Sequence, residues 1–404
     1  MNGESGTRPY LTEQIPGIGG VIKETPEDFL VEEIPLYQPC GEGEHLYVEI
    51  EKRGITTLEA IRRIARLLRL QERDIGYAGM KDAKGTTRQT LSIPRVQPEQ
   101  IMELDIPGVR PLSAARHRNK LKLGHLAGNR FRLTIRKVVD GALDRSDAIL
   151  KILAARGVPN IFGPQRYGIQ GNSHIIGRAL LCGDHKGAVD ALIGDAATVT
   201  DERWKTAIEA FHRGEMEESL RLFPPGCRAE REIVQRLAEK PGSPEKALHA
   251  INPRMRSLYL SAWQSALFDR IVMQRINSLD RIEAGDLAWK HQNGACFLVE
   301  DAATETRRCT SFEISPTGPL FGPNMTWPSG EVRAREEQAL ASEGLTPDGP
   351  ASGWPPRLDG ARRPLRVPLL DCTSGSDGNN LHLGFTLPKG SYATSVLREI
   401  MKQW

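Results

Sequence analysis

The stretch Gly76–Ser92 places one carboxylate, Asp82, among several cations. These cations are Lys81, Lys84 and Arg88. Small residues on both sides, such as Gly79 and Gly85, let another molecule approach the backbone closely. A carboxylate surrounded by cations is expected to stay ionised at neutral pH, and an ionised aspartate on an open loop can act as a nucleophile. The alternative is a solvated turn residue, as most Lys-Asp pairs in glycine-rich loops are.

Two further side chains lie in patterns that admit more than one role. Lys23 follows Val21–Ile22 at the end of a short extended segment, where a cation needs water or a carboxylate partner. Taken alone, it is an edge-strand lysine that faces solvent. Phe131 belongs to a two-residue period over Arg130–Ile135, and Asn129 has the same parity just before it. A phenylalanine in such a pattern is ordinarily a core residue.

The distribution of charge says more than its sum. The chain has 54 Lys and Arg against 51 Asp and Glu, a net charge of only +3. From Ile106 through Val139 there is nevertheless no acidic residue. The basic residues of this block are Arg110, Arg116, Arg118, Lys120, Lys122, Arg130, Arg132, Arg136 and Lys137. The block is either a phosphate-binding surface or a solvated basic face without a partner.

Alternation and helical spacing indicate the elements that would position these residues. Strands are expected at His45–Glu51, Thr87–Ile93, Arg130–Ile135 and Leu381–Leu387. A helix is expected to begin at Thr56, with Glu59 at the capping-box spacing. Its buried stripe is predicted to contain Leu58, Ile61, Ile64 or Ala65, and Leu68. A second helix follows the turn Pro388–Ser391.

A chain of 404 residues is expected to form two domains. Strands lie near both ends, and the region between them is mostly helical until a Pro- and Gly-rich loop at Thr346–Pro356. We therefore predict an α+β fold. A sheet domain is made of residues 1–156 and 361–404, and a mostly helical domain, 157–360, is inserted into it.

Several classes of protein are disfavoured by composition. No run of about eighteen apolar residues is present, so a membrane span is not expected. Met1–Pro16 is polar and lacks the apolar segment of a signal peptide, which favours a cytoplasmic protein. The six cysteines show no Cys-x-x-Cys pair and no histidine at ligand spacing, so neither a zinc site nor a disulfide framework is expected. No coiled-coil seam is present, and a monomer is the expected state.

Five motifs, in order along nearly the whole chain, resemble the TruD family of tRNA pseudouridine synthases. They are Lys23–Phe29, Ala78–Asp82 with Thr87–Gln89, Gly128–Phe131, Val158–Gly168 and Leu387–Ser395. The sequence departs from the family pattern at Gly85, where alanine is usual, and at Ile161, where tyrosine is common. The inserted segment matches poorly in detail, apart from a helix around Ser261–Phe268.

The resemblance implies a role for each matching residue. Asp82 would attack the target nucleoside covalently, and Lys23 would be its cationic partner. Phe131 would stack on the flipped uracil. Asn129, Lys81 and Gln89 would bind the substrate beside it. No cofactor and no metal would be required.

The resemblance also implies tRNA as the partner, with uridine 13 in the D-stem region as the target. The RNA would lie in a basic cleft between the two domains, held by the basic block. Two alternatives stay open at this point. One is a non-catalytic RNA-binding module on the same scaffold, and the other is a synthase that modifies a different uridine or a different RNA.

Overall fold

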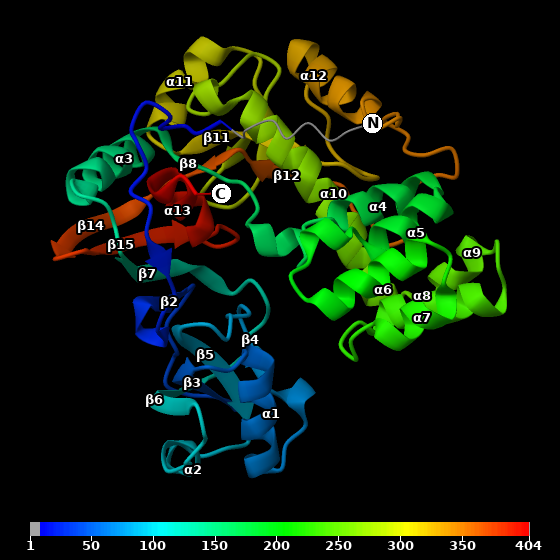
Figure 1. Cartoon of the computed structure of the whole chain (residues 1–404). Coiled ribbons are helices and arrows are strands. Elements are labelled where there is room, and N and C mark those ends of the chain that lie inside the picture. Colours follow the sequence, from blue (N-terminus) through cyan, green and yellow to red (C-terminus); the bar gives the residue numbers. More distant parts are fainter. Residues whose placement is uncertain (1–8, 404) are drawn as a thin grey trace. The chain divides into compact units, whose positions relative to one another are not determined.

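The computed structural model of the chain describes residues 9–403, which fold into two compact units (Figure 1). One unit, here called the sheet unit, combines residues 10–158 with residues 367–403. The other, the inserted unit, takes Pro159–Arg366. The predicted inserted segment, 157–360, differs from this range by a few residues at each end. All candidate site residues lie in the sheet unit.

The sheet unit is built on one mixed sheet with the strand order β14-β15-β7-β2-β5-β3-β6. In chain order the strands are β2 (Phe29–Pro35), β3 (His45–Arg53), β5 (Thr86–Pro94), β6 (Val109–His117), β7 (Leu126–Arg136), β14 (Leu370–Asp377) and β15 (Asn380–Pro388). Two short strands, β1 (Val21–Ile22) and β4 (Gly76–Tyr77), pair with β7 and β5. β15 lies along β7, so the C-terminal end of the chain completes the N-terminal sheet (Figure 1).

One face of this sheet, the apolar face, carries the candidate site. A single row of directly paired residues crosses five strands on it, in the order Phe385, Phe131, Val31, Thr87 and Lys52. At one end of the face, α1 (Thr57–Leu68) packs on the buried β3 residues Leu46, Val48 and Ile50. At the other end, α3 (Ala142–Arg156) packs on β14, and α13 (Ala393–Met401) packs on α3.

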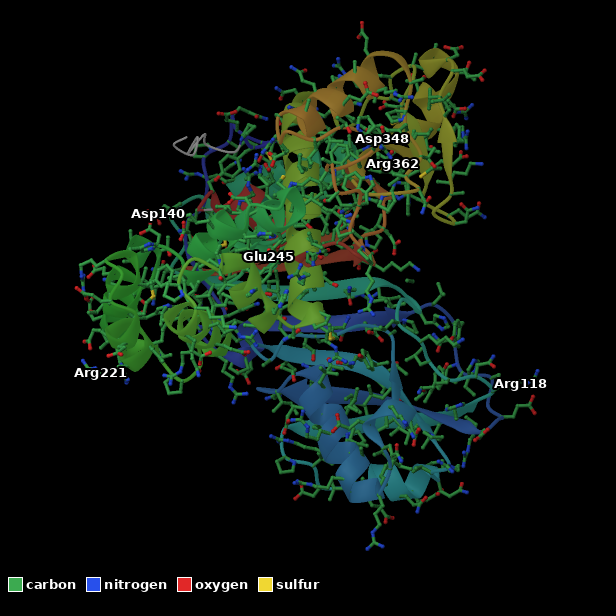
Figure 2. All side chains as sticks on the ribbon, turned by 90° about the vertical axis from the view of Figure 1, so that its right-hand side faces the viewer. Arg118, Asp140, Arg221, Glu245, Asp348 and Arg362 are labelled. Carbon is green, nitrogen blue, oxygen red and sulfur yellow. The ribbon has the colours of Figure 1, made fainter. Side chains whose placement is uncertain are left out.

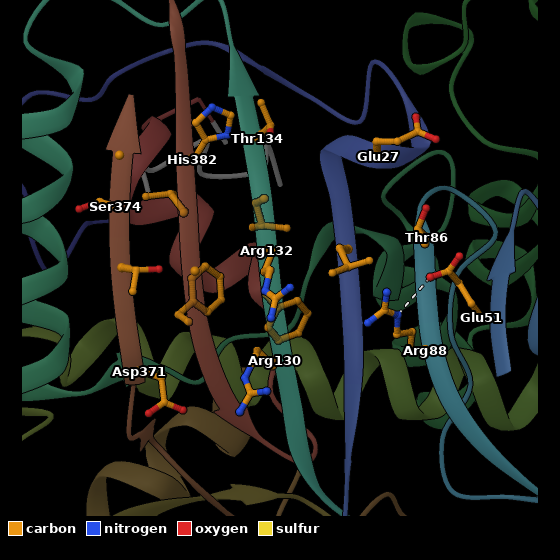
Figure 3. A pocket seen from close by; sticks show the side chains of 18 of the residues that line it. Glu27, Glu51, Thr86, Arg88, Arg130, Arg132, Thr134, Asp371, Ser374 and His382 are labelled. Carbon is orange, nitrogen blue, oxygen red and sulfur yellow. Dashed lines mark hydrogen bonds and ion pairs between the residues drawn. The ribbon is translucent and has the colours of Figure 1, made fainter. Parts of the chain in front are cut away.

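The opposite, polar face of the sheet holds a row of alternating charges. Its members are Arg110, Glu51, Arg88, Glu32 and Arg130, each directly opposite the next. Neighbours in the row form ion pairs. The shortest joins Arg88 Nη1 and Glu32 Oε1 at 3.0 Å, and the longest joins Arg130 Nη1 and Glu32 Oε2 at 3.7 Å. A hollow of about 770 Å³ lies over this face (Figure 3).

The strands predicted from alternation are confirmed, and β3, β5 and β7 extend beyond the predicted ranges. The helix after Thr56 is confirmed as α1, and the Thr56 side chain accepts a hydrogen bond from the Glu59 N–H at 3.2 Å. The prediction for Leu58 is wrong, because this side chain is exposed. Ile61, Ile64 and Ala65 are buried as predicted, and Thr57 and Ala60 complete the buried stripe in place of Leu58.

The inserted unit begins with helices packed around a core of their own. They are α4 (Ser173–Cys182), α5 (His185–Ile193), α6 (Glu202–His212), α7 (Met216–Leu222), α8 (Arg228–Glu239), α9 (Pro244–Ala247) and α10 (Pro253–Gln274). This confirms the predicted helical character as far as α10. The turn-rich loop predicted at Thr346–Pro356 is also confirmed.

The second half of the inserted unit is not mostly helical, which corrects the prediction. A sheet with the strand order β10-β9-β11-β12 follows α10. Its strands are β9 (Leu287–Lys290), β10 (Cys296–Leu298), β11 (Ile314–Leu320) and β12 (Ala361–Pro364), and α11 (Ala302–Thr310) and α12 (Gly330–Ala341) lie between them in the chain. β11 contains Pro316, Gly318 and Pro319. These residue types are depleted in strands, and they hid β11 from a pattern-based prediction.

Short elements connect the rest. They are α2 (Pro98–Met102), β8 (Val158–Pro159), β13 (Arg366–Val367), and the 3₁₀ turns η1 (Pro26–Asp28), η2 (Glu72–Asp74), η3 (Pro164–Tyr167), η4 (Ala196–Thr198), η5 (Leu248–Ala250) and η6 (Ile276–Ser278). Among residues 9–403, no helix combines the length and apolarity needed to cross a membrane. The polar stretch Met1–Pro16 lies in part outside the described residues.

Candidate active site

The Asp82 loop, Ala78–Gly85, connects β4 to β5 at the edge of the apolar face. The Asp82 side chain is 60% exposed, and no donor within residues 9–403 hydrogen-bonds its carboxylate. The Lys23 ammonium lies 4.0 Å from Asp82 Oδ2 and is only 20% exposed. This distance is an ion pair and not a hydrogen bond. Asp82 is thus an accessible carboxylate whose nearest cation is half-enclosed by the protein.

Lys23 is held between this carboxylate and an aromatic ring. Its ammonium lies 4.1 Å from the centroid of the Phe29 ring, within the range of a cation–π interaction. Burial lowers the pKa of Lys23, the Asp82 charge opposes this shift, and Lys84 adds to it. The structure therefore brings Lys23 and Asp82 together, as the resemblance implies.

Three aromatic rings form a floor beside Lys23, here called the aromatic floor. Phe131 lies 6.4 Å from Phe29 in an edge-to-face arrangement and 5.4 Å from Phe385. All three side chains are buried, with Phe29 8%, Phe131 6% and Phe385 1% exposed. Sequence reasoning assigned no role to Phe29 or Phe385. The signal that could have found Phe385 is its parity in the alternating segment Leu381–Leu387.

Lys81 points away from solvent, toward Glu33 on β2 and Asn129 on β7. Its ammonium forms an ion pair with Glu33 Oε2 at 3.3 Å and donates a hydrogen bond to Asn129 Oδ1. Burial raises the pKa of Glu33 and lowers the pKa of Lys81, and the attraction between the two opposes both shifts. Because Oδ1 of Asn129 accepts from Lys81, the amide NH₂ is the part of Asn129 left to donate to another molecule.

Gln89 is buried beneath the same loop. Its Oε1 accepts a hydrogen bond from the Thr57 hydroxyl at 2.9 Å, and its Nε2 donates to the Gly79 carbonyl at 3.4 Å. The Thr57 hydroxyl in turn accepts from the Lys81 N–H at 2.8 Å. Gln89 and Thr57 therefore hold the backbone of the Asp82 loop against β5 and α1.

The basic block does not form a surface of one sign. Acidic residues from outside the block pair with Arg110, Arg118, Arg136 and Lys137, and Glu32 lies near both Arg130 and Arg132. Arg118 points outward from the sheet unit and is paired with Glu42 (Figure 2). The phosphate-binding surface was one of two interpretations of the block. It was based on a one-dimensional count, which cannot see these carboxylates at residues 24–51.

The motif Asn160–Gly168 lies in the inserted unit and binds α10. Asp269 Oδ1 accepts from the Phe162 N–H at 2.9 Å, and Asp269 Oδ2 accepts from the Tyr167 hydroxyl at 2.6 Å. Arg166 donates to the Ser265 hydroxyl at 2.9 Å. These contacts fix the segment to the longest helix of the unit, and this role accounts for its polar and aromatic residues.

An exposed carboxylate, a half-buried lysine and a floor of aromatic edges together suit covalent attack on a flat ring that packs against the floor. This geometry suits an enzyme that acts on a planar substrate. Because Asn129 presents an amide donor next to Phe131, the ring would carry hydrogen-bond acceptors.

Comparison with known proteins identifies the family. Residues 4–400 match the family model of tRNA pseudouridine synthase D (TruD). The tRNA pseudouridine synthase D of Geobacter metallireducens is 62% identical over 398 residues, 98% of each chain. The protein of that name from Thermus thermophilus is 38% identical over 98% of this chain and 92% of its own. The chain therefore belongs to the TruD family of tRNA pseudouridine synthases, which are isomerases.

A solved structure agrees with this assignment. A crystal structure from Methanosarcina mazei that carries the same family name superposes with a TM-score of 0.82 and 28% identity. The match covers 98% of this chain and 96% of that one. The mixed α+β architecture, with its helical region between sheet segments, is thus shared with a solved relative.

Proposed function

We propose that this chain isomerises a uridine of tRNA to pseudouridine, with Asp82 as the nucleophile and uridine 13 as the target. The observation that carries the proposal is the exposed Asp82 carboxylate beside Lys23 and next to the aromatic floor. The family match over residues 4–400 supports the class of reaction. Uridine 13 is taken from the resemblance to the family.

The reaction breaks the N1–C1′ glycosidic bond, turns the base and forms a C5–C1′ bond. C5 loses a proton and N1 gains one, so the product is an isomer and no second reagent is consumed. The Asp82 carboxylate bonds covalently to the nucleoside as the N1–C1′ bond breaks. This bond breaks again when the C5–C1′ bond forms, which regenerates the carboxylate. The Lys23 ammonium, 4.0 Å from Asp82 Oδ2, offsets negative charge that develops there during the reaction.

The base is recognised by packing and by one polar contact. The target uracil must leave its stack to reach Asp82. Phe131 is only 6% exposed, so the base would pack against the small part of its ring that reaches the surface. The Asn129 NH₂ group donates to a uracil carbonyl oxygen, because Lys81 occupies the amide oxygen. The apolar ring of Phe131 beside it lowers the local dielectric constant, which strengthens this hydrogen bond.

Lys81 and Gln89 support this site from below. Their side chains are hydrogen-bonded within the protein, to Asn129 and to Thr57 respectively. We propose that they orient Asn129 and the Asp82 loop. Direct contact of either side chain with the substrate stays a prediction.

The test is a single-turnover reaction with unmodified tRNA that carries tritium at C5 of its uridines. Isomerisation releases the C5 hydrogen, so each turnover frees one tritium, and mapping of the product locates the modified uridine. The wild-type protein and Asp82→Asn are compared at equal concentration. We expect release from one D-stem uridine in the wild type and a loss of at least about 1,000-fold in Asp82→Asn, with tRNA affinity unchanged.

Each other outcome rejects a defined part of the proposal. Release by Asp82→Asn near the wild-type rate would remove Asp82 as the nucleophile. Release from a uridine outside position 13 would correct the target and keep the chemistry. Tight binding without tritium release by either protein would indicate an RNA-binding module on a synthase scaffold.

A further inference from the structure

Lys52, near the end of β3, is a buried cation outside the site residues assigned above. Its side chain is 0% exposed, and it occupies the same row of the apolar face as Phe131. No carboxylate of residues 9–403 lies within ion-pair distance of its ammonium. A buried charge without an ionic partner is costly unless hydrogen bonds satisfy it. The structure therefore requires a reason for a lysine at this position.

The Lys52 ammonium is satisfied by three backbone carbonyls. It donates to the carbonyl of Ile55, in the turn that leads to α1, at 2.8 Å. It donates to the carbonyl of Asp82 at 2.7 Å and to that of Lys81 at 3.3 Å. Two of its three hydrogen bonds thus end on the Asp82 loop, and the shortest is made to the nucleophile's own residue.

Residues 79–85 have no regular secondary structure, so the side chains of Thr57, Gln89 and Lys52 supply hydrogen bonds that hold the loop. Gly85 has a φ of 139°, a conformation open to glycine, and a Cβ there would lie 2.6 Å from the Phe29 carbonyl oxygen. The loop therefore passes close to the aromatic floor without being tied to it by strand pairing. Thr57, the first residue of α1, accepts a hydrogen bond from the Lys81 N–H, and Lys52 donates to the Lys81 carbonyl.

We propose that Lys52 is a positioning residue for the reaction, which anchors the backbone of Asp82 so that its carboxylate is held beside Lys23 over the aromatic floor. This inference rests on the proposed function of Asp82. It assigns to Lys52 no contact with the substrate. Lys52, Thr57 and Gln89 together form the support of the Asp82 loop.

The charge of Lys52 is suited to this role. Burial lowers the pKa of Lys52 to about 8, with Asp82 raising it and Lys81 lowering it further. The lysine is therefore largely protonated at neutral pH, when it has three hydrogens for three carbonyls. A neutral amine has only two hydrogens, so one of the three carbonyls would lose its hydrogen-bond donor at higher pH.

The experiment compares Lys52→Met with a matched control, Lys402→Met. Lys402 also donates to a buried backbone group, the Thr12 carbonyl at 2.8 Å, and burial lowers its pKa as well. It lies at the end of α13, away from the Asp82 loop. Both variants lose a carbonyl-binding lysine of the sheet unit, but only Lys52→Met removes support from Asp82. Lys402 also forms an ion pair with Glu399 at 3.7 Å, so the control variant loses that ion pair as well.

Two readouts are taken. In single-turnover tritium release, Lys52→Met should be slower than the wild type by about 100-fold, because small misplacements of a nucleophile cost that much. Its tRNA affinity should stay within about threefold, and Lys402→Met should react at the wild-type rate. In limited trypsin digestion without RNA, Lys52→Met should be cut at Lys81 or Lys84 at least about tenfold faster, since hydrogen bonds from a charged donor are lost.

The outcomes separate this inference from the proposed function. If the wild type releases no tritium, the proposed function fails, and trypsin digestion still decides whether Lys52 anchors the loop. A rate in Lys52→Met equal to that of Lys402→Met, or equal rates of cleavage, would overturn the inference. If Lys52→Met does not fold, Lys52→Arg is measured. Its guanidinium keeps the charge but is wider than the ammonium, and a wild-type rate in that variant would equally overturn the inference.

Discussion

Lys23 adopts a left-handed backbone conformation, with a φ of 61°, directly after β1. Such a conformation costs a residue with a side chain about 1–2 kcal/mol. Such a conformation persists where contacts of the side chain with the surrounding structure offset its cost. Here it places the ammonium 4.1 Å from the Phe29 ring and 4.0 Å from Asp82. The strained residue is thus found at the one carboxylate that is proposed to react.

Removal of this cation should slow the chemical step more than it weakens binding. We expect Lys23→Met to lower the single-turnover rate by about 100-fold, as the loss of one electrostatic contact to a reacting group does. Lys23→Arg keeps the charge and should retain more of the rate than Lys23→Met. Rates and tRNA affinities are measured for all three proteins. Equal rates in Lys23→Met and Lys23→Arg would mean that the charge of Lys23 plays no part.

At the scale of elements, η1 connects the Lys23 segment to the sheet. The Asp28 carboxylate accepts hydrogen bonds from Arg136 on β7, at 3.0 Å from Nε and 2.7 Å from Nη2, and from the Thr25 N–H at 2.9 Å. Asp28 is buried, and the hydrogen bond from Arg136 is the main reason that its pKa lies below the usual value. This pair therefore fixes the entry into β2 and, through it, the place of Lys23.

The Asp28–Arg136 pair should contribute to stability in a pH-dependent way. Because the folded-state pKa of Asp28 is lowered, its contribution is complete above the unfolded value of about 3.9 and is lost as the pH falls through the folded value. We expect Asp28→Asn to lower the free energy of unfolding by about 2–3 kcal/mol at pH 7. The difference from the wild type should be smaller at about pH 3, because below about 3.9 Asp28 of the unfolded protein takes up a proton more readily than the folded carboxylate does.

Urea unfolding at both pH values measures this effect, and Asp377→Asn is the control. Asp377 pairs with His382 on the surface, at 2.9 Å, and its side chain is largely exposed. Exposed pairs contribute less than about 1 kcal/mol, so Asp377→Asn should change the free energy of unfolding little. A loss in Asp28→Asn that is no larger than in Asp377→Asn, or that does not depend on pH, would contradict the assigned role.

The strands and α1 were predictable because their apolar periods are regular, and the second half of the inserted unit was not. β11 carries two prolines and a glycine, and its place in a sheet follows only from its pairing with β9 and β12. Lys52 shows that the alternation in β3 carried information that the prediction did not use. The alternation Leu46, Val48, Ile50 continues to Lys52, which predicts a buried lysine if the strand is extended by one residue.

In the candidate site, too, the features that depend on neighbouring residues were predictable and the contacts between distant segments were not. The open, glycine-rich surroundings of Asp82 are visible in the sequence, and its loop is exposed as expected. The partners of Lys81 and Gln89 are not visible, since Glu33, Asn129 and Thr57 come from three other segments. The aromatic floor likewise joins residues from β2, β7 and β15, whose strand order no local pattern gives.

For the whole molecule, the distribution of charge over the two faces of the sheet limits where tRNA can bind. Arg130 and Arg132 belong to the polar face, opposite Asp82, and both lie near Glu32 (Figure 3). Lys84 belongs to the Asp82 loop, and Lys122 lies in the adjoining β6–β7 connection. Neither lysine has an ion pair among residues 9–403. An RNA whose base reaches Asp82 can meet these lysines without reaching the far face of the sheet.

The salt dependence of tRNA binding should therefore follow Lys84 and Lys122 and not the paired arginines. Each phosphate contact contributes about 0.7–0.9 to the slope of log K against log salt concentration. We expect Lys84→Gln with Lys122→Gln to reduce that slope by about 1.5, and Arg130→Gln with Arg132→Gln to leave it within about 0.3 of the wild type. Both double variants remove two positive charges, so a general effect of net charge would lower both slopes alike. A reduction confined to the arginine variant would instead place the RNA on the polar face, and the base would then have no path to Asp82.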